Sequence, residues 1–302
     1  MDRSRITPEL VRCLVRDQFP RWAELPVTPV ELSGWDNATF RLGDTMSVRL
    51  PTAEGYVPQV DKEHRWLPYL APRLPLPVPV PLARGEPGRG YPWPWSVYRW
   101  LDGRPALPGA IADLDRFARD LAGFLGALHE VDATDGPPAG EHSAHRGGHP
   151  STYDAETRAA VDELDDEIDT DAALAVWEAV LAAEWRGPPV WVHGDMTPSN
   201  LLAVDGRLAA VIDFGACAVG DPACDTAIAW TLFTGSSRDV FWRALPVDDA
   251  TLARGRGWAL WKALITHAEA RRRGPEAVAT AGLKFGWRAN ARAIVEDLIG
   301  GQ

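Results

Sequence analysis

The chain has 302 residues, of which 31 are Lys or Arg and 42 are Asp or Glu, so the formal net charge is −11. This balance argues against a protein that binds nucleic acid, because affinity for the phosphate backbone comes mainly from clustered Lys and Arg. It is compatible with a cationic small-molecule partner. The three cysteines include no C-x-x-C pair, so they predict neither a disulfide framework nor a zinc site.

The residues predict neither a targeting segment nor a membrane span. The N-terminus, MDRSRITPEL, has no apolar signal core, and nowhere do eighteen apolar residues follow one another. The length allows one large domain or two modest ones. Hydrophobic residues make up 46% of the chain, which is enough to bury a core. We therefore expect a cytoplasmic protein, monomer or homodimer, that binds neither a membrane nor nucleic acid.

The first hundred residues are predicted to combine strands with two helices. Alternating apolar runs that are separated by Gly34 and by Gly43-Asp44 are typical of an antiparallel meander with tight turns. Between 72 and 81 a proline stands at nearly every second position, which predicts an extended connection. In chain order, the expected elements are a helix at 5–19, strands at 30–32, 38–42 and 46–50, a helix at 56–70 and a strand at 95–101.

The rest of the chain is predicted to be mainly helical. Apolar residues recur with helical spacing over 111–131, and a loop rich in Gly, Pro and His follows at 135–150. Two short apolar runs within 190–213 predict strands, and the further expected helices are at 154–184, 222–233, 236–244 and most of 248–298. We predict an α+β protein with an antiparallel β-rich lobe over residues 1–101 and a mainly helical lobe over 102–302.

The strongest local signal is a pair of acidic motifs in register. Residues 193–200 read H-G-D-M-T-P-S-N, and an apolar strand that ends in D-F-G follows at 211–215. Phosphoryl transfer uses such a set, because one carboxylate orients the acceptor hydroxyl and takes its proton. A carboxamide and a second carboxylate then hold Mg²⁺ against a triphosphate, since this hard cation prefers oxygen ligands. The two motifs together favour such a site over a hairpin with incidental acidic residues.

The first lobe is expected to supply a clamp for a nucleotide. The turn at 33–40, which includes Trp35 and Asn37, lies between two strands, where exposed backbone N–H groups can reach phosphate oxygens. It holds a single glycine, so a plain hairpin is the alternative. Arg49 stands in the third strand where protein kinases carry lysine, and Glu63, fourteen residues later on a helix, is expected to pair with it.

With these motifs, the chain resembles the aminoglycoside phosphotransferase family, the small-molecule branch of the protein-kinase-like fold, over essentially its whole length. The most specific parts are the motifs at 193–200 and 212–215 and the segment G-D-P-A-C-D at 220–225. The resemblance implies a two-lobed kinase-like fold that uses ATP and Mg²⁺.

The resemblance also implies roles for individual residues. It makes Asp195 the catalytic base, and it makes Asn200 and Asp213 the ligands of Mg²⁺. Asp221 and Asp225 are implied to brace the catalytic loop, with direct contact between Asp225 and the substrate as the alternative.

Two departures from the protein-kinase pattern change the expected function. Gly194 replaces the arginine of H-R-D, and Gly220 stands only five positions after Gly215, which leaves no room for an activation segment. The sequence therefore predicts an enzyme that is always active. The second departure is Arg49, which keeps the charge of the usual lysine and can contact phosphate and Glu63 together. Lys62 is the alternative phosphate ligand.

By position, the strand at 96–100 resembles the hinge between the lobes of the family. The side chains concerned are Ser96, Tyr98 and Trp100, and the adenine edge would bond to backbone N–H and C=O groups there. Such backbone bonds place few constraints on the side chains, so these residues do not distinguish a nucleotide site for ATP from one for GTP. ATP is the default expectation.

The acceptor is expected to bind to the inserted and C-terminal helices of the second lobe. The loop 141–149, with three histidines that leave zinc as an alternative, is one candidate, and the acidic run at 162–171 is another, with a solvated helix face as its alternative. Core packing is the alternative for the two tryptophans at 258 and 261. The individual candidates are His142, Tyr153, Asp154, Asp225, Trp230, Trp258, Trp261 and Glu269.

The sequence thus predicts a phosphotransferase that moves the γ-phosphoryl group of ATP to a hydroxyl group of a small molecule. The resemblance implies an antibiotic such as an aminoglycoside as the acceptor, and hence antibiotic resistance. A metabolite, such as a sugar or a choline-like or homoserine-like alcohol, is the alternative acceptor. An inert kinase-like binding protein and a protein kinase are the rival classes.

Overall fold

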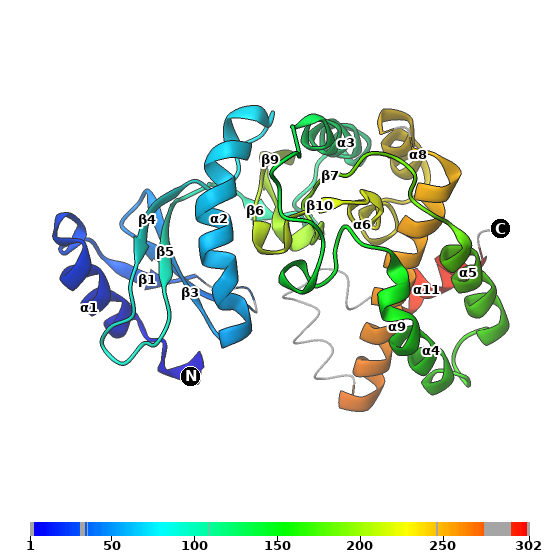
Figure 1. The fold of residues 1–302 in the computed structure, drawn as a ribbon, viewed down its shortest axis with the longest axis horizontal. Helices are drawn as coiled ribbons and strands as arrows, with labels where there is room; N and C mark the ends of the chain where they lie inside the picture. Colours follow the sequence, from blue (N-terminus) through cyan, green and yellow to red (C-terminus); the bar gives the residue numbers. More distant parts are fainter. Residues whose placement is uncertain are drawn as a thin grey trace. The chain divides into compact units, whose positions relative to one another are not determined.

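The computed structural model describes residues 3–30, 34, 36–107, 109–245, 247–274 and 291–300 (Figure 1). The chain divides into two compact units. The first contains Met1–Asp102 and Val211–Gly215, and the second contains Gly103–Ala210 and Ala216–Gln302. The D-F-G segment, which was expected within the C-terminal lobe, therefore belongs to the first unit.

An antiparallel five-stranded sheet forms the first unit, in the order β1-β2-β3-β5-β4. The strands are β1 (Val27–Pro29), β2 (Asn37–Leu42), β3 (Met46–Pro51), β4 (Pro81–Gly85) and β5 (Trp95–Arg99). The predicted meander is confirmed in β2 and β3. Of the strand expected at 30–32, residues 31 and 32 lie outside the described residues; β1 runs over Val27–Pro29, and Pro29 is tolerated there because β1 is an edge strand.

Two helices accompany this sheet, α1 (Pro8–Gln18) and α2 (Val57–Leu70). The side chain of Thr7 caps α1 by accepting a hydrogen bond from the backbone N–H of Leu10, and Pro8 occupies the first turn. Helix α2 turns Glu63 inward among apolar residues, with 4% of its surface exposed. A buried carboxylate needs a partner, so this burial marks α2 as part of a polar site.

The second unit is mainly helical, which confirms the predicted α+β class. Its helices are α3 (Leu114–Glu130), α4 (Asp154–Glu163), α5 (Thr170–Ala182), α6 (Ala223–Thr226), α7 (Ile228–Thr231), α8 (Gly235–Ala244), α9 (Asp249–Arg273) and α11 (Ala291–Gly300). Figure 1 shows α4, α5 and α11 beside the long helix α9, and apolar residues of these four helices form one buried cluster.

Two small sheets complete the second unit. One has the order β6-β8-β9, from β6 (Arg104–Pro105), β8 (Leu201–Val204) and β9 (Arg207–Val211); the other pairs β7 (Val190–Val192) with β10 (Ala218–Gly220). Short 3-10 turns lie at Arg3–Arg5, Pro20–Trp22, Glu54–Tyr56, Ala71–Arg73, Glu141–Ser143, Pro150–Tyr153, Pro198–Asn200 and Phe214–Ala216. Strand β7 runs directly into the H-G-D motif, so the motif follows a buried strand.

Three predicted helices differ from the structure. The single helix expected over 154–184 is two helices, because the acidic run interrupts it and Asp169 caps α5 by accepting from the backbone N–H of Ala172. The helix expected over 222–233 is likewise two short helices, α6 and α7. Of the helix expected over 248–298, residues 275–290 lie outside the described part of the chain.

Within the described ranges, no helix combines the length and the apolar character that a membrane span requires.

Candidate active site

The H-G-D…N motif forms a tight loop in the second unit, between β7 and β8. The side-chain amide of Asn200 donates to the backbone oxygen of Asp195 and to its carboxylate Oδ2, both at 2.9 Å. The Asp195 carboxylate is half-buried, and 7% of the Asn200 surface is exposed. Both hydrogen bonds use the amide nitrogen, so the amide oxygen is the atom of Asn200 that could ligate a metal.

Asp225 holds the backbone of this loop. Its side chain is fully buried, and its carboxylate accepts from the N–H of His193 at 2.7 Å and from the N–H of Gly194 at 2.8 Å. Burial raises the pKa of the Asp225 carboxyl group, which the two backbone N–H groups partly offset. Asp225 therefore braces the catalytic loop as expected, and both of its oxygens face the loop, which disfavours the alternative of contact with an acceptor.

Gly194 is required by the backbone. Its φ is +85°, and a Cβ atom at this position would lie 2.4 Å from the carbonyl oxygen of Ala216. A side chain would therefore clash as well as strain the backbone. This contact gives the physical reason why no arginine stands between His193 and Asp195.

A second buried carboxylate binds an arginine that the sequence did not single out. Asp221 accepts from Nε of Arg254 at 2.6 Å, and its other oxygen accepts from the N–H of Ala223 at 3.0 Å. The Arg254 side chain is fully buried on α9. A distance of 33 residues separates the partners, and no local pattern predicts such a pair.

The first unit contains a cluster of charged side chains around Arg49. Its guanidinium lies 3.4 Å from Glu63 Oε1 and 2.7 Å from Asp213 Oδ1, so the expected ion pair with Glu63 is present and Asp213 joins it. The hydroxyl of Tyr98 donates to the other oxygen of Glu63. Burial raises the pKa of Glu63, although Arg49 opposes this shift, and burial raises the pKa of Tyr98 well above its usual value.

Asp213 adopts a left-handed backbone, with φ of +68°, and 27% of its side chain is exposed. Asp213 and Asn200 each offer oxygen atoms, which suit Mg²⁺, and the guanidinium of Arg49, 2.7 Å from Asp213, is a cation with which a metal would compete. The donor chemistry of these residues therefore fits a magnesium ion. The described residues contain no group of three or more His, Cys, Asp or Glu side chains placed to hold a metal ion.

Two residues of the predicted hinge, Ser96 and Tyr98, lie within strand β5 of the sheet. Its backbone pairs with β3 on one side and with β4 on the other, at Ser96 and at Tyr98 alike. An adenine edge therefore finds the backbone of these two residues already bonded. The side chains are buried as well: Ser96 bonds to His64 at 3.0 Å, and Tyr98 bonds to Glu63.

The remaining nucleotide candidates lie at the ends of strands. Asn37 begins β2, opposite Pro51, with 8% of its surface exposed. Trp100 follows β5 and lies under the guanidinium of Arg41, 4.3 Å from Cζ to the ring centre. Trp35 lies outside the described residues.

Most acceptor-binding candidates have structural partners. Trp258 and Trp261 expose 3% and 5% of their surfaces and pack edge to face, so neither offers a stacking platform to a sugar. Tyr153 stacks on Trp261 with ring centres 4.0 Å apart. The contacts of the others are Trp230 on Trp242 at 5.4 Å, His142 to the oxygen of Pro138 at 2.8 Å, and Glu269 to Arg273 at 3.1 Å.

The acidic run at 162–171 is paired with basic side chains. Asp166 and Glu167 contact Arg271 of α9, Glu167 lies 2.9 Å from His267, and Glu163 contacts Arg272. These three acids link α4 and the α4–α5 connection to α9, and the break between α4 and α5 means that the run is not one continuous helix face.

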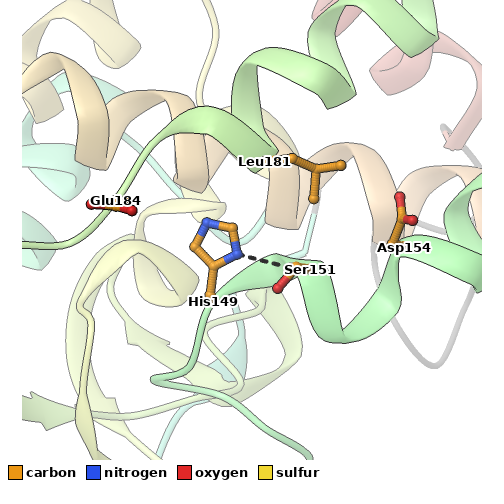
Figure 2. Close-up of a pocket in the computed structure, with 5 residues that line it drawn as sticks. All are labelled: His149, Ser151, Asp154, Leu181 and Glu184. Carbon is orange, nitrogen blue, oxygen red and sulfur yellow. Dashed lines mark hydrogen bonds between the residues drawn. The ribbon is translucent and has the colours of Figure 1, made fainter.

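One pocket in the second unit lies beside the loop 135–150. Figure 2 shows that His149, Ser151, Asp154, Leu181 and Glu184 line it, and its volume is about 520 Å³. His149 accepts from the N–H of Ser151 at 3.2 Å, and Asp154 accepts from Arg158 and from the Trp177 indole. The carboxylate of Asp154 is therefore already paired with a cation.

Three comparisons with known proteins place the chain. The model of the phosphotransferase enzyme family matches residues 27–264, so the chain belongs to this family. An aminoglycoside 3'-phosphotransferase of Escherichia coli is 33% identical over 116 residues, which are 36% of this chain and 41% of that protein. The match thus spans less than half the length of this relative.

Solved structures of similar fold cover the whole chain. The GDP complex of wild-type aminoglycoside 2'-phosphotransferase-IIIa has a TM-score of 0.71 at 18% identity, over 97% of this chain and 99% of that one. Macrolide 2'-phosphotransferase MphH from Brachybacterium faecium has a TM-score of 0.55 at 25% identity, over 97% and 98%. These similarities confirm the predicted fold, and the family model confirms the predicted family.

Proposed function

We propose that this protein transfers the γ-phosphoryl group of a nucleoside triphosphate, with Mg²⁺, to a hydroxyl group of a small-molecule antibiotic, and so confers resistance. The observation that carries the proposal is the hydrogen bond from the Asn200 amide to the Asp195 carboxylate. This bond fixes a carboxylate in the H-G-D…N loop of a chain that belongs to a family of phosphotransferases. Phosphoryl transfer depends mainly on positioning and on charge stabilisation, and this loop supplies the positioning.

In the proposed reaction, Asp195 accepts a hydrogen bond from the acceptor hydroxyl and takes its proton as the oxygen attacks the γ-phosphorus. The bond from the γ-phosphorus to the oxygen that bridges it to the β-phosphate breaks, and the nucleoside diphosphate leaves. Asn200 limits rotation of the carboxylate, and Asp225 and Gly194 fix the loop that carries it. Arg49, held by Glu63, contacts the phosphates of the nucleotide. Asn200 and Asp213 would hold the Mg²⁺ ion, which neutralises charge on the phosphoryl oxygens.

The proposed acceptor is an aminoglycoside or a macrolide. The relatives named above are aminoglycoside and macrolide phosphotransferases, and a net charge of −11 is compatible with a cationic molecule of either class. The nucleotide is proposed to be ATP or GTP, since related structures hold GDP in one case and ATP in another.

The test is a coupled assay of ADP and GDP release over a panel of aminoglycosides, macrolides and small alcohols, with the products identified by mass spectrometry. We expect a product heavier by one phosphoryl group with at least one antibiotic. Asp195→Asn should lower kcat by roughly 10²–10⁴-fold and spare nucleotide binding. Asp239→Asn, an exposed position on α8, is the matched control. Full turnover by Asp195→Asn, or phosphorylation of small alcohols alone, would refute the proposal.

A further inference from the structure

The loop before α4 carries an arginine in an unusual backbone setting. Ala144 and His145 both have left-handed backbones, with φ of +47° and +56°, and Gly147 follows at +84°. Left-handed conformations are unfavourable for residues other than glycine, and they persist only where surrounding contacts enforce them. Arg146 lies between these positions, so the loop is strained around the residue that it presents.

The guanidinium of Arg146 is held by aromatic rings. Its Cζ lies 4.6 Å from the centre of the Trp261 ring and 4.7 Å from that of Trp258, and the Tyr153 ring is 5.7 Å away. Tyr153 is fixed in turn, because its hydroxyl donates to the oxygen of Ala144 at 2.8 Å. Cations bind to aromatic faces in such positions, so the rings determine where the guanidinium lies.

From this position, Nε of Arg146 donates to the backbone oxygen of Gly194 at 3.1 Å. That oxygen belongs to the peptide group between Gly194 and Asp195. The N–H of the same peptide group donates to Nδ1 of His193 at 3.2 Å. Both polar ends of the group are therefore bonded, and the N–H of Gly194 is bound by Asp225. The peptide plane that carries Asp195 is thus fixed on both sides.

We propose that Arg146 is a positioning residue for Asp195: it holds the Gly194–Asp195 peptide group and so sets the direction of the Asp195 carboxylate. This inference rests on the proposed function, because it assigns Arg146 to the same reaction. Arg146 does not touch the reacting atoms. It acts through one backbone oxygen, and a small misplacement of a catalytic group lowers kcat strongly while leaving substrate binding unchanged.

A spectroscopic test reads the peptide group directly. The sequence contains three Gly-Asp pairs, at 43–44, 194–195 and 220–221, so a protein labelled with ¹³C-carbonyl glycine and ¹⁵N-aspartate gives three cross-peaks in a carbonyl–nitrogen correlation. In Arg146→Ala and Arg146→Gln we expect the 194–195 peak to move and the 43–44 peak to stay. The 220–221 peak reports the loop itself, since the N–H of Asp221 donates to the oxygen of Gly147.

The kinetic arm uses the same variants. We expect kcat of Arg146→Ala to fall by roughly 10²-fold with the nucleotide KM unchanged. Added guanidinium should restore kcat of Arg146→Ala, whose aromatic cage is vacated, and should not restore Arg146→Gln, whose stem fills the cage. Arg243→Ala, at an exposed position on α8, is the control.

The two arms separate the two proposals. A 194–195 peak that stays in place in both folded variants, or a kcat equal to that of the wild type, overturns the role of Arg146. A shifted peak in a protein that phosphorylates no acceptor refutes the proposed function and leaves the bond from Arg146 to the Gly194 carbonyl supported. A helical circular-dichroism signal and a urea midpoint equal to those of the wild type show that each variant is folded, because the second unit is mainly helical and the 43–44 peak reports the first unit alone.

Discussion

The two polar clusters that carry the proposed chemistry are held by different kinds of bond. In the first unit, charged side chains neutralise one another, because Arg49 lies between Glu63 and Asp213. In the second unit, charged side chains hold the backbone: Asp225 accepts from two N–H groups, and Arg146 donates to one carbonyl.

This difference separates a cluster that can exchange partners from one that cannot. Phosphate oxygens bind guanidinium as strongly as carboxylates do, so a nucleotide can take over a bond of Arg49. The backbone N–H groups of the catalytic loop are bonded to the carboxylate of Asp225, which is fully buried and therefore out of reach of a ligand in solution. The first cluster is therefore suited to bind a charged ligand, and the second is suited to hold the backbone of the catalytic loop in one conformation.

The largest expected effect on stability is at Arg49, because its removal takes the cation away from the two carboxylates of the first cluster. Arg49→Ala leaves Glu63 buried without its cation, so the free energy of unfolding should fall by about 3–5 kcal/mol. The nucleotide KM should rise as well. Urea denaturation and steady-state kinetics measure the two effects, with Arg49→Lys as the variant that retains the charge. If the KM of Arg49→Ala equals that of the wild type, Arg49 does not bind the phosphates, and Lys62 becomes the candidate.

A smaller effect on stability is expected at Asp225, the carboxylate that holds the backbone of the catalytic loop. Asp225→Asn keeps one acceptor oxygen and presents an amide N–H₂ to the second backbone N–H, which is left unpaired. We expect a loss of about 2 kcal/mol in the free energy of unfolding. Turnover should fall while the nucleotide KM stays constant. A variant that is stable but binds nucleotide poorly would contradict the separation of roles.

The third prediction concerns a buried group that the second unit keeps uncharged. Burial lowers the pKa of His129 on α3 from 6.5 to about 4, so between these pH values the unfolded chain binds more protons than the folded one. The stability contributed by His129 is therefore complete above pH 6.5 and is lost as the pH falls towards 4. From pH 7 to pH 5 we expect a loss of about 2 kcal/mol.

Urea denaturation of the wild type and of His129→Gln at both pH values isolates this contribution. The glutamine variant should lack the extra loss on acidification, since it has no group that titrates there. An equal loss in both proteins would show that His129 is not the group responsible.

The sequence predicts those parts of the site that depend on neighbouring residues. Asp195 and Asn200 stand five residues apart in one loop, and Arg49 and Glu63 stand on a strand and the next helix, so local spacing was enough to pair them. The antiparallel sheet followed from the alternating pattern of β2 and β3. The strand expected at 30–32 falls mostly outside the described residues, and β1 was not predicted, because an edge strand is bound on one side only and constrains its residues less.

Partners distant in the chain were missed. Arg146 lies 48 residues from Gly194, and Tyr98 lies 35 residues from Glu63; each pair is made by tertiary packing. The position of β5 between β3 and β4 was missed for the same reason, since a strand that is central in a sheet cannot be told from an edge strand by its own residues. The break between α4 and α5 had a visible signal in Asp169, an N-cap residue that precedes a helix-forming run.

The backbone of Asp213 also limits what mutation can place at that position. Only glycine, asparagine and aspartate adopt a φ near +68° at low cost, and of these only aspartate carries a charge. Any other substitution is therefore expected to weaken folding at the same time as it removes the carboxylate. In a selection for resistance, most substitutions of Asp213 would therefore fail for two reasons at once, a weaker fold and a missing carboxylate. Asp213→Asn removes the charge and tolerates the backbone conformation, so it is the informative variant in a mutational scan.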